Sequence, residues 1–242
     1  MLDSYEIRKL VNKGVFDMEE RLENVNKGAQ LKPSLFGMIG SPGEQLEKIR
    51  QHPKIWLAML IITTIFTVGT VLTMMAMDTA SLIGEDIPAE GQVLMEIFTI
   101  VVGVVMGLFT PIISVLISSV IILIIAKIAQ SDVTFKQLFS MNTYICLIVA
   151  LGALLNGLVR FLIGGNPEIY VTSLAGLLNS ESYVLGAIEV FTIWSLILTG
   201  IGLNKVARLS KGLSWTVAIV FFLFQIGMAV ISGMFAGLGG MQ

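Results

Sequence analysis

The sequence predicts an all-α protein, a polytopic membrane helical bundle with five transmembrane helices, on the strength of its composition and its apolar runs. Of the 242 residues, 55% are hydrophobic and 13% are charged, which is about half the charged fraction of a soluble domain. Five apolar runs have about 20 residues or more, the length that a helix needs to cross the hydrocarbon core. None alternates as barrel strands do, so the backbone must form its hydrogen bonds within helices. The predicted spans are 55–77, 97–126, 144–163, 184–203 and 213–235.

The composition also excludes several classes of protein. A mean hydropathy of +0.87 argues against a soluble enzyme, a disordered chain and a nucleic-acid-binding protein. The chain has one cysteine, Cys146, and one histidine, His52, so we expect no internal disulfide and no histidine-rich metal site. Phosphate-binding loops, zinc-protease motifs, Cys-x-x-Cys and nucleophile elbows are missing from the sequence. We therefore expect a protein that is not an enzyme and that has no cofactor, no metal ion and no nucleic-acid partner.

Residues 1–33 are expected to form a cytoplasmic amphipathic N-terminal segment. Its apolar residues recur every three or four positions, as on one face of a helix: Ile7, Val11, Val15, Met18, Leu22 and Val25. Such a helix can lie on the membrane surface or on the protein's own loops; alternatively, it can bind a partner or a second copy. We expect no cleavable signal peptide, so the first span must itself direct insertion.

A second helix is predicted directly before the first span. Ser41 is suited to the N-cap, Pro42 to the first helical position, and Glu44 lies three residues after Ser41, as in a capping box. The helix 42–51 ends before Pro53, which opens the first span. We expect this short helix to lie along the inner membrane surface and to have an architectural role without chemistry.

The second apolar run is too long for one simple crossing. Thirty helical residues extend about 45 Å, whereas the hydrocarbon core is about 30 Å thick. Pro111, near the middle of this run, removes one backbone hydrogen bond and should kink the helix. We expect either a kinked long helix or an outer turn that extends beyond the bilayer. A re-entrant pair of short helices is the remaining alternative.

The charges between the spans predict the orientation of the chain. The segments that follow the first and third spans contain carboxylates and no lysine or arginine. The segments that follow the second and fourth spans contain the basic residues Lys127, Lys136, Lys205, Arg208 and Lys211. Because cytoplasmic loops carry the basic residues, we expect the N-terminus inside the cell and the C-terminus outside. The predicted location is the cell membrane, crossed several times.

Two ionisable residues lie within the predicted spans, where a charge is costly and marks a candidate site. Arg160, near the end of the third span, and Glu189, near the start of the fourth, are expected at similar depth near the outer surface. We predict a structural polar pair, reinforced by Asn156 one turn deeper. There are two alternatives: Arg160 extends to the outer headgroups, or the two residues form a substrate or proton site. Gln225, midway along the last span, is predicted to hydrogen-bond between helices.

Three segments resemble bacterial Yip-family (YIP-domain) membrane proteins. They are the string FGMIGSPGEQLEKIRQHP before the first span, TFKQLFSMNTY before the third, and FTIWSLILTGIGL in the fourth, covering 36–53, 134–144 and 191–203. The resemblance spans about residues 34–235 and implies a YIP-like membrane domain, 34–242, with five spans. It is strongest to a group of Gram-positive membrane proteins associated with an ABC exporter system that takes part in resistance to a toxic peptide.

These observations lead to one principal hypothesis about function. We expect a non-enzymatic accessory protein of the bacterial cytoplasmic membrane that contacts the lipid bilayer and binds other membrane proteins. The resemblance implies ABC exporter subunits as partners and a role in protection against a toxic membrane-active peptide; self-association is also possible. The alternative is a transporter or channel acting on its own, supported by Pro111 within a long helix. The third hypothesis is an intramembrane enzyme. The absence of a nucleophile–base pair from the predicted spans argues against it.

Overall fold

The computed structural model describes residues 32–77, 88–164 and 170–239, together with positions 13, 15, 16 and 18. All its elements are helices: α2 (Gly37–Gly40), α3 (Pro42–Gln51), α4 (Trp56–Met75), α6 (Ala89–Ile128), α7 (Phe135–Ile163), α8 (Leu174–Leu178), α9 (Tyr183–Ala187), α10 (Val190–Lys205) and α11 (Lys211–Gly239). Of the N-terminal apolar stripe, Val15 and Met18 are helical and exposed, and the other positions lie outside the described residues. The predicted all-α class is confirmed.

Four of these helices are long and apolar enough to cross a membrane: α4, α6, α7 and α11. The fifth apolar helix, α10, has 16 residues and extends only about 24 Å. All five follow the predicted order along the chain, and the polytopic helical bundle is therefore confirmed. The fourth predicted span, however, is not one uninterrupted helix, as described below.

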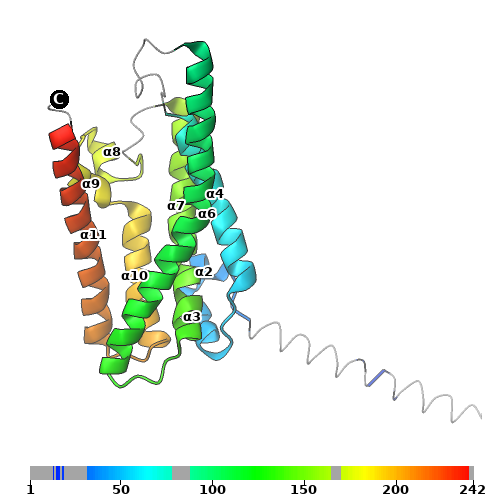
Figure 1. The fold of residues 1–242 in the computed structure, drawn as a ribbon. Helices are drawn as coiled ribbons and strands as arrows, with labels where there is room; N and C mark the ends of the chain where they lie inside the picture. Colours follow the sequence, from blue (N-terminus) through cyan, green and yellow to red (C-terminus); the bar gives the residue numbers. More distant parts are fainter. Residues whose placement is uncertain are drawn as a thin grey trace, which may run out of the picture.

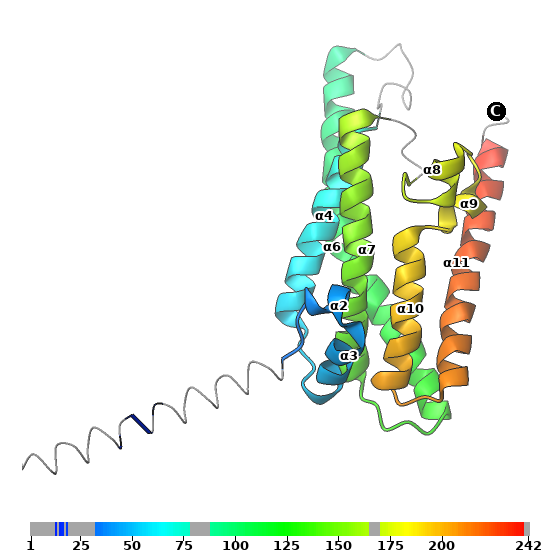
Figure 2. The ribbon, with the colours of Figure 1, turned by 180° about the vertical axis from the view of Figure 1, so that it is seen from behind.

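The five long helices form two groups, which Figures 1 and 2 show from opposite sides. The first group contains α4, α6 and α7, which pack extensively on one another. The second contains α10 and α11, and α10 joins it to α7. The short helices α2 and α3 lie at one end of the bundle, where α3 contacts α7 and α10, while α8 and α9 lie at the other end. Half of the most apolar window of α7 is buried, against 11% of that of α11, so α7 is the central helix.

The helices of the first group approach closely because glycines lie at their contacts. A Cβ atom added to Gly69 of α4 would lie 2.6 Å from the carbonyl carbon of Ala153 in α7. One added to Gly157 of α7 would collide with the carbonyl oxygen of Gly69. On the other side of α4, a Cβ at Gly107 of α6 would lie 2.6 Å from the Cα of Thr67. Small residues permit such backbone contact between membrane helices.

Helix α6 is one continuous helix of 40 residues with Pro111 inside it. At about 1.5 Å per residue it extends roughly 60 Å, twice the thickness of the hydrocarbon core. It begins eight residues before the predicted span, and the added turns carry Glu90 and Glu96, which belong in water. Figure 1 shows it bending along its length rather than turning back on itself. The re-entrant pair of short helices was therefore not the right alternative.

The helix α3 begins at Pro42 and ends at Gln51, as predicted, and Pro53 lies in the link to α4. The predicted capping box is wrong, because Ser41 makes no side-chain hydrogen bond to the start of α3. Ser41 also closes α2, so its hydroxyl donates instead to the carbonyl of Gly37. The carboxylate of Glu44 pairs with Lys48 one turn later, at 2.7 Å.

The capping box that does form belongs to α7, which begins at Phe135 and not at the predicted residue 144. The Thr134 hydroxyl accepts from the backbone N–H of Gln137, whose side chain in turn accepts from the N–H of Thr134. Farther along α7, Ser140 donates to the carbonyl of Lys54 at 2.7 Å. The Ser140 contact attaches the link between α3 and α4 to the central helix.

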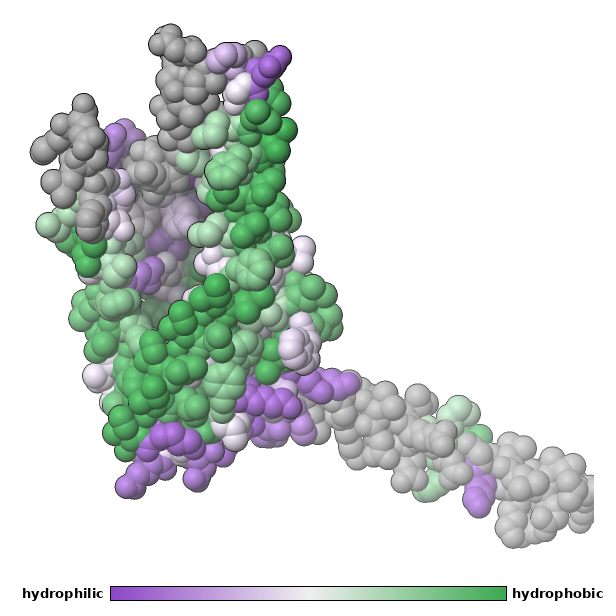
Figure 3. Space-filling view, viewed as in Figure 1, coloured by the Kyte–Doolittle hydropathy of each residue, from purple (hydrophilic) through white to green (hydrophobic). Residues whose placement is uncertain are grey.

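The surface separates into an apolar belt and a basic end (Figure 3). Apolar residues cover the sides of the bundle, and hydrophilic residues gather where α3 lies beside the α6–α7 and α10–α11 connections. This end carries Lys48, Arg50, Lys54, Lys127, Lys136, Lys205, Arg208 and Lys211. The distribution agrees with the predicted cytoplasmic placement of this end.

Candidate functional site

The fourth predicted span, 184–203, is interrupted at its polar residue, which corrects the expectation of a single helix. Helix α9 ends at Ala187, and α10 starts at Val190 with Glu189 as its N-cap. The carbonyl of Ile188 accepts from the N–H of Leu174, at 2.8 Å, and the N–H of Val190 donates to the carbonyl of Thr172, at 3.3 Å. The preceding segment therefore supplies backbone hydrogen bonds in place of those that a continuous helix would have made, and these bonds stabilise the break.

Glu189 is 4% exposed, and both of its carboxylate oxygens have partners. Oε2 accepts from the N–H of Thr192, at 2.8 Å, as expected of a helix cap, and Oε1 accepts from the Thr172 hydroxyl, at 2.6 Å. A carboxylate at a helix N-terminus also interacts favourably with the positive end of the helix dipole. The buried charge thus fixes the start of α10.

Asn156 extends the same network to α7. Its side-chain oxygen accepts from the backbone N–H of Thr172, at 3.1 Å, and its amide group contacts the Thr172 hydroxyl, at 2.7 Å, and donates to the carbonyl of Gly152, at 2.8 Å. The residue is 2% exposed. Thr172, between α7 and α8, therefore bonds to both Asn156 and Glu189. The two side chains that the sequence predicted to lie together are joined through this third residue.

Arg160 is 2% exposed and lies one turn beyond Asn156 on α7. Tyr170 lies near both Arg160 and Glu189: the pKa of its phenol is raised by burial first and by the Glu189 carboxylate second, while Arg160 lowers it. The structure thus places the two charges around one phenol. The direct ion pair between Arg160 and Glu189 stays a prediction.

This network is suited to positioning rather than to chemistry. The side chains of Asn156, Thr172 and Glu189 all bond to one another or to the backbone, so none is held out toward a substrate. Within residues 32–77, 88–164 and 170–239 there is no group of three His, Cys, Asp or Glu side chains that could hold a metal ion. The network joins α7 to α10 at the end of the bundle opposite the basic loops.

A second polar feature is a cleft between the two helix groups. It has a volume of about 220 Å³ and lies between α6, α7, α10 and α11. Its polar lining consists of Thr110, Ser114, Ser118, Asn142, Ser195 and Thr199. Figure 3 shows the surface hollowed between α6 and α11. Pro111, the proline identified from the sequence, also lines this cleft. It lies inside α6 without interrupting that helix.

Gln225 lies beside this cleft, at a smaller adjoining cavity of about 80 Å³ that shares Ser195 and Thr199 with it. It is exposed and makes no hydrogen bond to any other residue that the structure describes. The predicted bond between helices of the same chain was therefore not found in this part of the molecule. Gln225 remains the one amide of α11 directed at a polar cavity.

Sequence reasoning missed Thr172 and the hydroxyls of the cleft. Thr172 lies outside every apolar run, so no pattern connected it to Asn156. Thr192, Ser195 and Thr199 do recur every three or four residues along α10, and this spacing could have indicated a hydroxyl-bearing face.

The fold and these intramembrane polar features define a polytopic helical membrane protein. The chain belongs to the Yip1 family, since its residues 36–234 match the Yip1 domain. It is 35% identical over 228 residues to the membrane protein YknW of Bacillus subtilis (strain 168), covering 91% of this chain and 97% of that one. The resemblance to bacterial YIP-domain proteins of the YknW type is thus confirmed, and so is the multi-pass membrane location. No solved structure matches the chain.

Proposed function

We propose that the protein is a non-enzymatic accessory protein that binds other membrane proteins through the cleft between its two helix groups. The observation that carries this proposal is the exposed Gln225 amide beside a hydroxyl-lined cavity, on a helix of which only 11% is buried within the chain. Polar groups within a bilayer need hydrogen-bond partners, because lipid tails offer none. A transmembrane helix of another protein can supply them.

The cleft has the chemistry to receive such a helix. The hydroxyls of Ser118, Ser195 and Thr199 donate to carbonyls of their own helices, at 2.7 to 2.9 Å. Their oxygens still have lone pairs, so they can accept hydrogen bonds from an incoming side chain. Gln225 offers both a donor and an acceptor. A partner helix with serine, threonine, asparagine or glutamine side chains would fit this surface best.

The partner that we propose is an ABC exporter, and the role is protection against a toxic membrane-active peptide. This part of the proposal rests on the sequence resemblance described above, which implies such a system for this branch of the family. The fold agrees with an accessory role, since the buried Glu189 bonds within the chain and no group of three His, Cys, Asp or Glu side chains comes together in the part of the chain that the structure describes.

Replacing Gln225 by leucine is expected to weaken the association with the partner at least about fivefold, the effect of losing one or two hydrogen bonds between membrane helices. Affinity purification of the full-length protein in a mild detergent should recover an ABC-type permease, ATPase or membrane-fusion subunit with the wild type. Quantitative mass spectrometry should show the loss of that subunit from Gln225→Leu.

Leu223→Ala provides the matched control, because Leu223 lies on the same helix at a nearby depth and is 58% exposed without lining either cavity. This variant should retain the partner. A wild-type preparation that contains no exporter subunit would contradict the proposed partner, and equal recovery with Gln225→Leu would contradict the proposed surface.

A further inference from the structure

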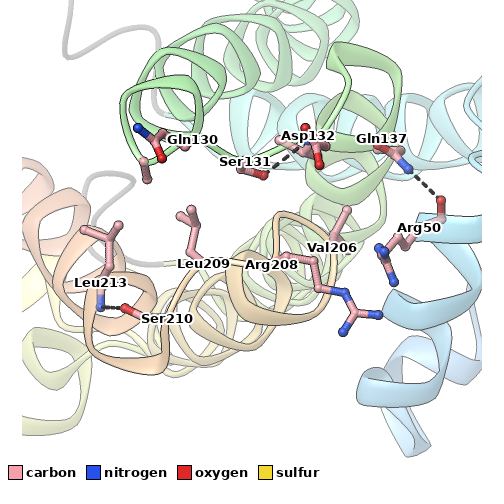
Figure 4. Close-up of a pocket in the computed structure, with 12 residues that line it drawn as sticks. Arg50, Gln130, Ser131, Asp132, Gln137, Val206, Arg208, Leu209, Ser210 and Leu213 are labelled. Atoms are coloured by element: carbon pink, nitrogen blue, oxygen red, sulfur yellow. Dashed lines mark hydrogen bonds between the residues drawn. The ribbon is translucent and has the colours of Figure 1, made fainter.

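A cavity of about 370 Å³ lies at the basic end of the bundle, outside the helix network described above. Figure 4 shows it between the 129–133 segment on one side and the 206–213 segment on the other, with Arg50 of α3 at its edge. Its polar lining consists of Arg50, Gln130, Ser131, Asp132, Gln137, Arg208 and Ser210. Three parts of the chain that are far apart in sequence therefore form one polar hollow.

Hydrogen bonds between these segments hold the walls of the cavity in place. The Ser131 hydroxyl donates to the carbonyl of Ala207 at 2.5 Å, and the Gln137 amide donates to the carbonyl of Arg50 at 2.8 Å. Arg208 has a positive φ of 56°, a conformation that costs energy in a residue other than glycine. Tertiary contacts thus join the 129–137 segment to Ala207 and to α3 around the cavity.

Two guanidinium groups, of Arg50 and Arg208, and two carboxylates, of Glu47 and Asp132, lie at the cavity, so the excess of positive charge comes from the lysines around it. Arg50 and Arg208 each lie 3.3 Å from the same oxygen of Glu47, so one carboxylate is shared between two guanidinium groups. Asp132, also in the lining, has no ion pair with another described residue. Lys127, Lys205 and Lys211 lie on the flanking helix ends and add to the positive potential. A singly charged anion with hydroxyl groups matches this arrangement of charges.

The exposed tryptophans at this end of the bundle indicate that the cavity lies at the depth of the lipid headgroups. It is bounded by the end of α6, the start of α7, the end of α10 and the start of α11. Trp56 and Trp215, near the starts of α4 and α11, are 88% and 41% exposed, and tryptophan is enriched at the membrane–water interface. A phospholipid in the same leaflet could therefore place its headgroup in the cavity while its acyl chains lie against the apolar belt.

We propose that this cavity binds the headgroup of an anionic phospholipid of the phosphatidylglycerol type. Arg50 and Arg208 would donate hydrogen bonds to the phosphodiester, for which guanidinium groups are well suited. Asp132 and Gln130 would accept hydrogen bonds from the glycerol hydroxyls of the headgroup. Basic pockets between helices on the cytoplasmic side are suited to such lipids.

The test uses the full-length protein in a neutral detergent, with bound lipids counted by native mass spectrometry. Phosphatidylglycerol should bind with at least about tenfold higher affinity than phosphatidylethanolamine, because only the former keeps the negative charge of its phosphate uncompensated. The double variant Arg50→Gln/Arg208→Gln should weaken phosphatidylglycerol binding by about tenfold or more. Lys54→Gln/Lys136→Gln removes the same charge from the same end but outside the cavity lining, and it should retain binding within about threefold.

A further variant guards against loss of folding as the explanation. Glu47→Gln removes the carboxylate that occupies both guanidinium groups, so it should strengthen the binding of phosphatidylglycerol, a result that an unfolded protein cannot give. Equal losses in the two double variants would overturn the proposal in favour of unspecific attraction. Preferential binding of phosphatidylethanolamine, or displacement of the lipid by millimolar inorganic phosphate, would also overturn it.

Discussion

Replacing Gly157 by alanine is expected to lower the free energy of unfolding by about 3 kcal/mol, the upper part of the range for overpacked cores. The added methyl group would collide with the carbonyl oxygen of Gly69, and neither backbone can move without separating α4 from α7. These two helices form the largest helix–helix contact of the described chain. Thermal unfolding in detergent, followed by circular dichroism, should show a clear loss of stability.

Gly227→Ala is the control for this substitution. Gly227 lies in α11, and no atom lies within 4 Å of the position that its Cβ would take. Alanine is favoured over glycine within a helix by about 1 kcal/mol, so this variant should unfold at the same temperature or a higher one. Equal destabilisation by the two substitutions would contradict the close contact between α4 and α7.

Replacing Asn156 by leucine is expected to destabilise the protein by about 2–3 kcal/mol, because it removes a buried amide that joins α7 to the backbone of Thr172. The N–H of Thr172 and the carbonyl of Gly152 both lose a bond to the Asn156 side chain. The effect should be local as well as global. Hydrogen exchange should accelerate in the segment 170–190, which depends on Thr172 for its link to α7.

Asn142→Leu is the matched comparison for this variant. Asn142 is also a buried asparagine of α7, but its amide makes one hydrogen bond, to the hydroxyl of Ser119 at 2.9 Å. The loss of stability should therefore be smaller, about 1 kcal/mol, and exchange in 170–190 should not change. Unaltered exchange in both variants would contradict the bridging role of Thr172.

The long helices could be predicted from the sequence because the bilayer imposes a length on each apolar run. Spans one and five coincide with α4 and α11 to within a few residues. Spans two and three were placed correctly, but both helices begin earlier than predicted. The added turns of α6 carry Glu90 and Glu96, whereas those of α7 are buried against the rest of the protein by tertiary contacts such as the one from Ser140 to Lys54. The Thr134–Gln137 capping box marks the true start of α7, whereas the similar pattern at Ser41 and Glu44 formed no cap because Ser41 also ends α2.

The break before α10 could not be predicted, because it depends on a distant segment. Glu189 lies in an apolar run that is long enough to span the membrane, and only the bonds from Thr172 and Leu174 make a non-helical backbone tolerable there. The same is true of the basic cavity, where Arg208 meets Glu47 across 161 positions of the sequence. Single-sequence patterns describe local periodicity and do not bring such residues together.

Cysteine accessibility in intact cells tests the central claim, that this helical bundle spans the membrane with its basic end in the cytoplasm. Gln130→Cys at the basic end and Glu181→Cys at the opposite end would each be introduced into a Cys146→Ser protein, and both replaced residues are exposed. A membrane-impermeant maleimide should label Glu181→Cys from outside and Gln130→Cys only after the cells are permeabilised. Labelling of Gln130→Cys in intact cells, with Glu181→Cys protected, would contradict this account.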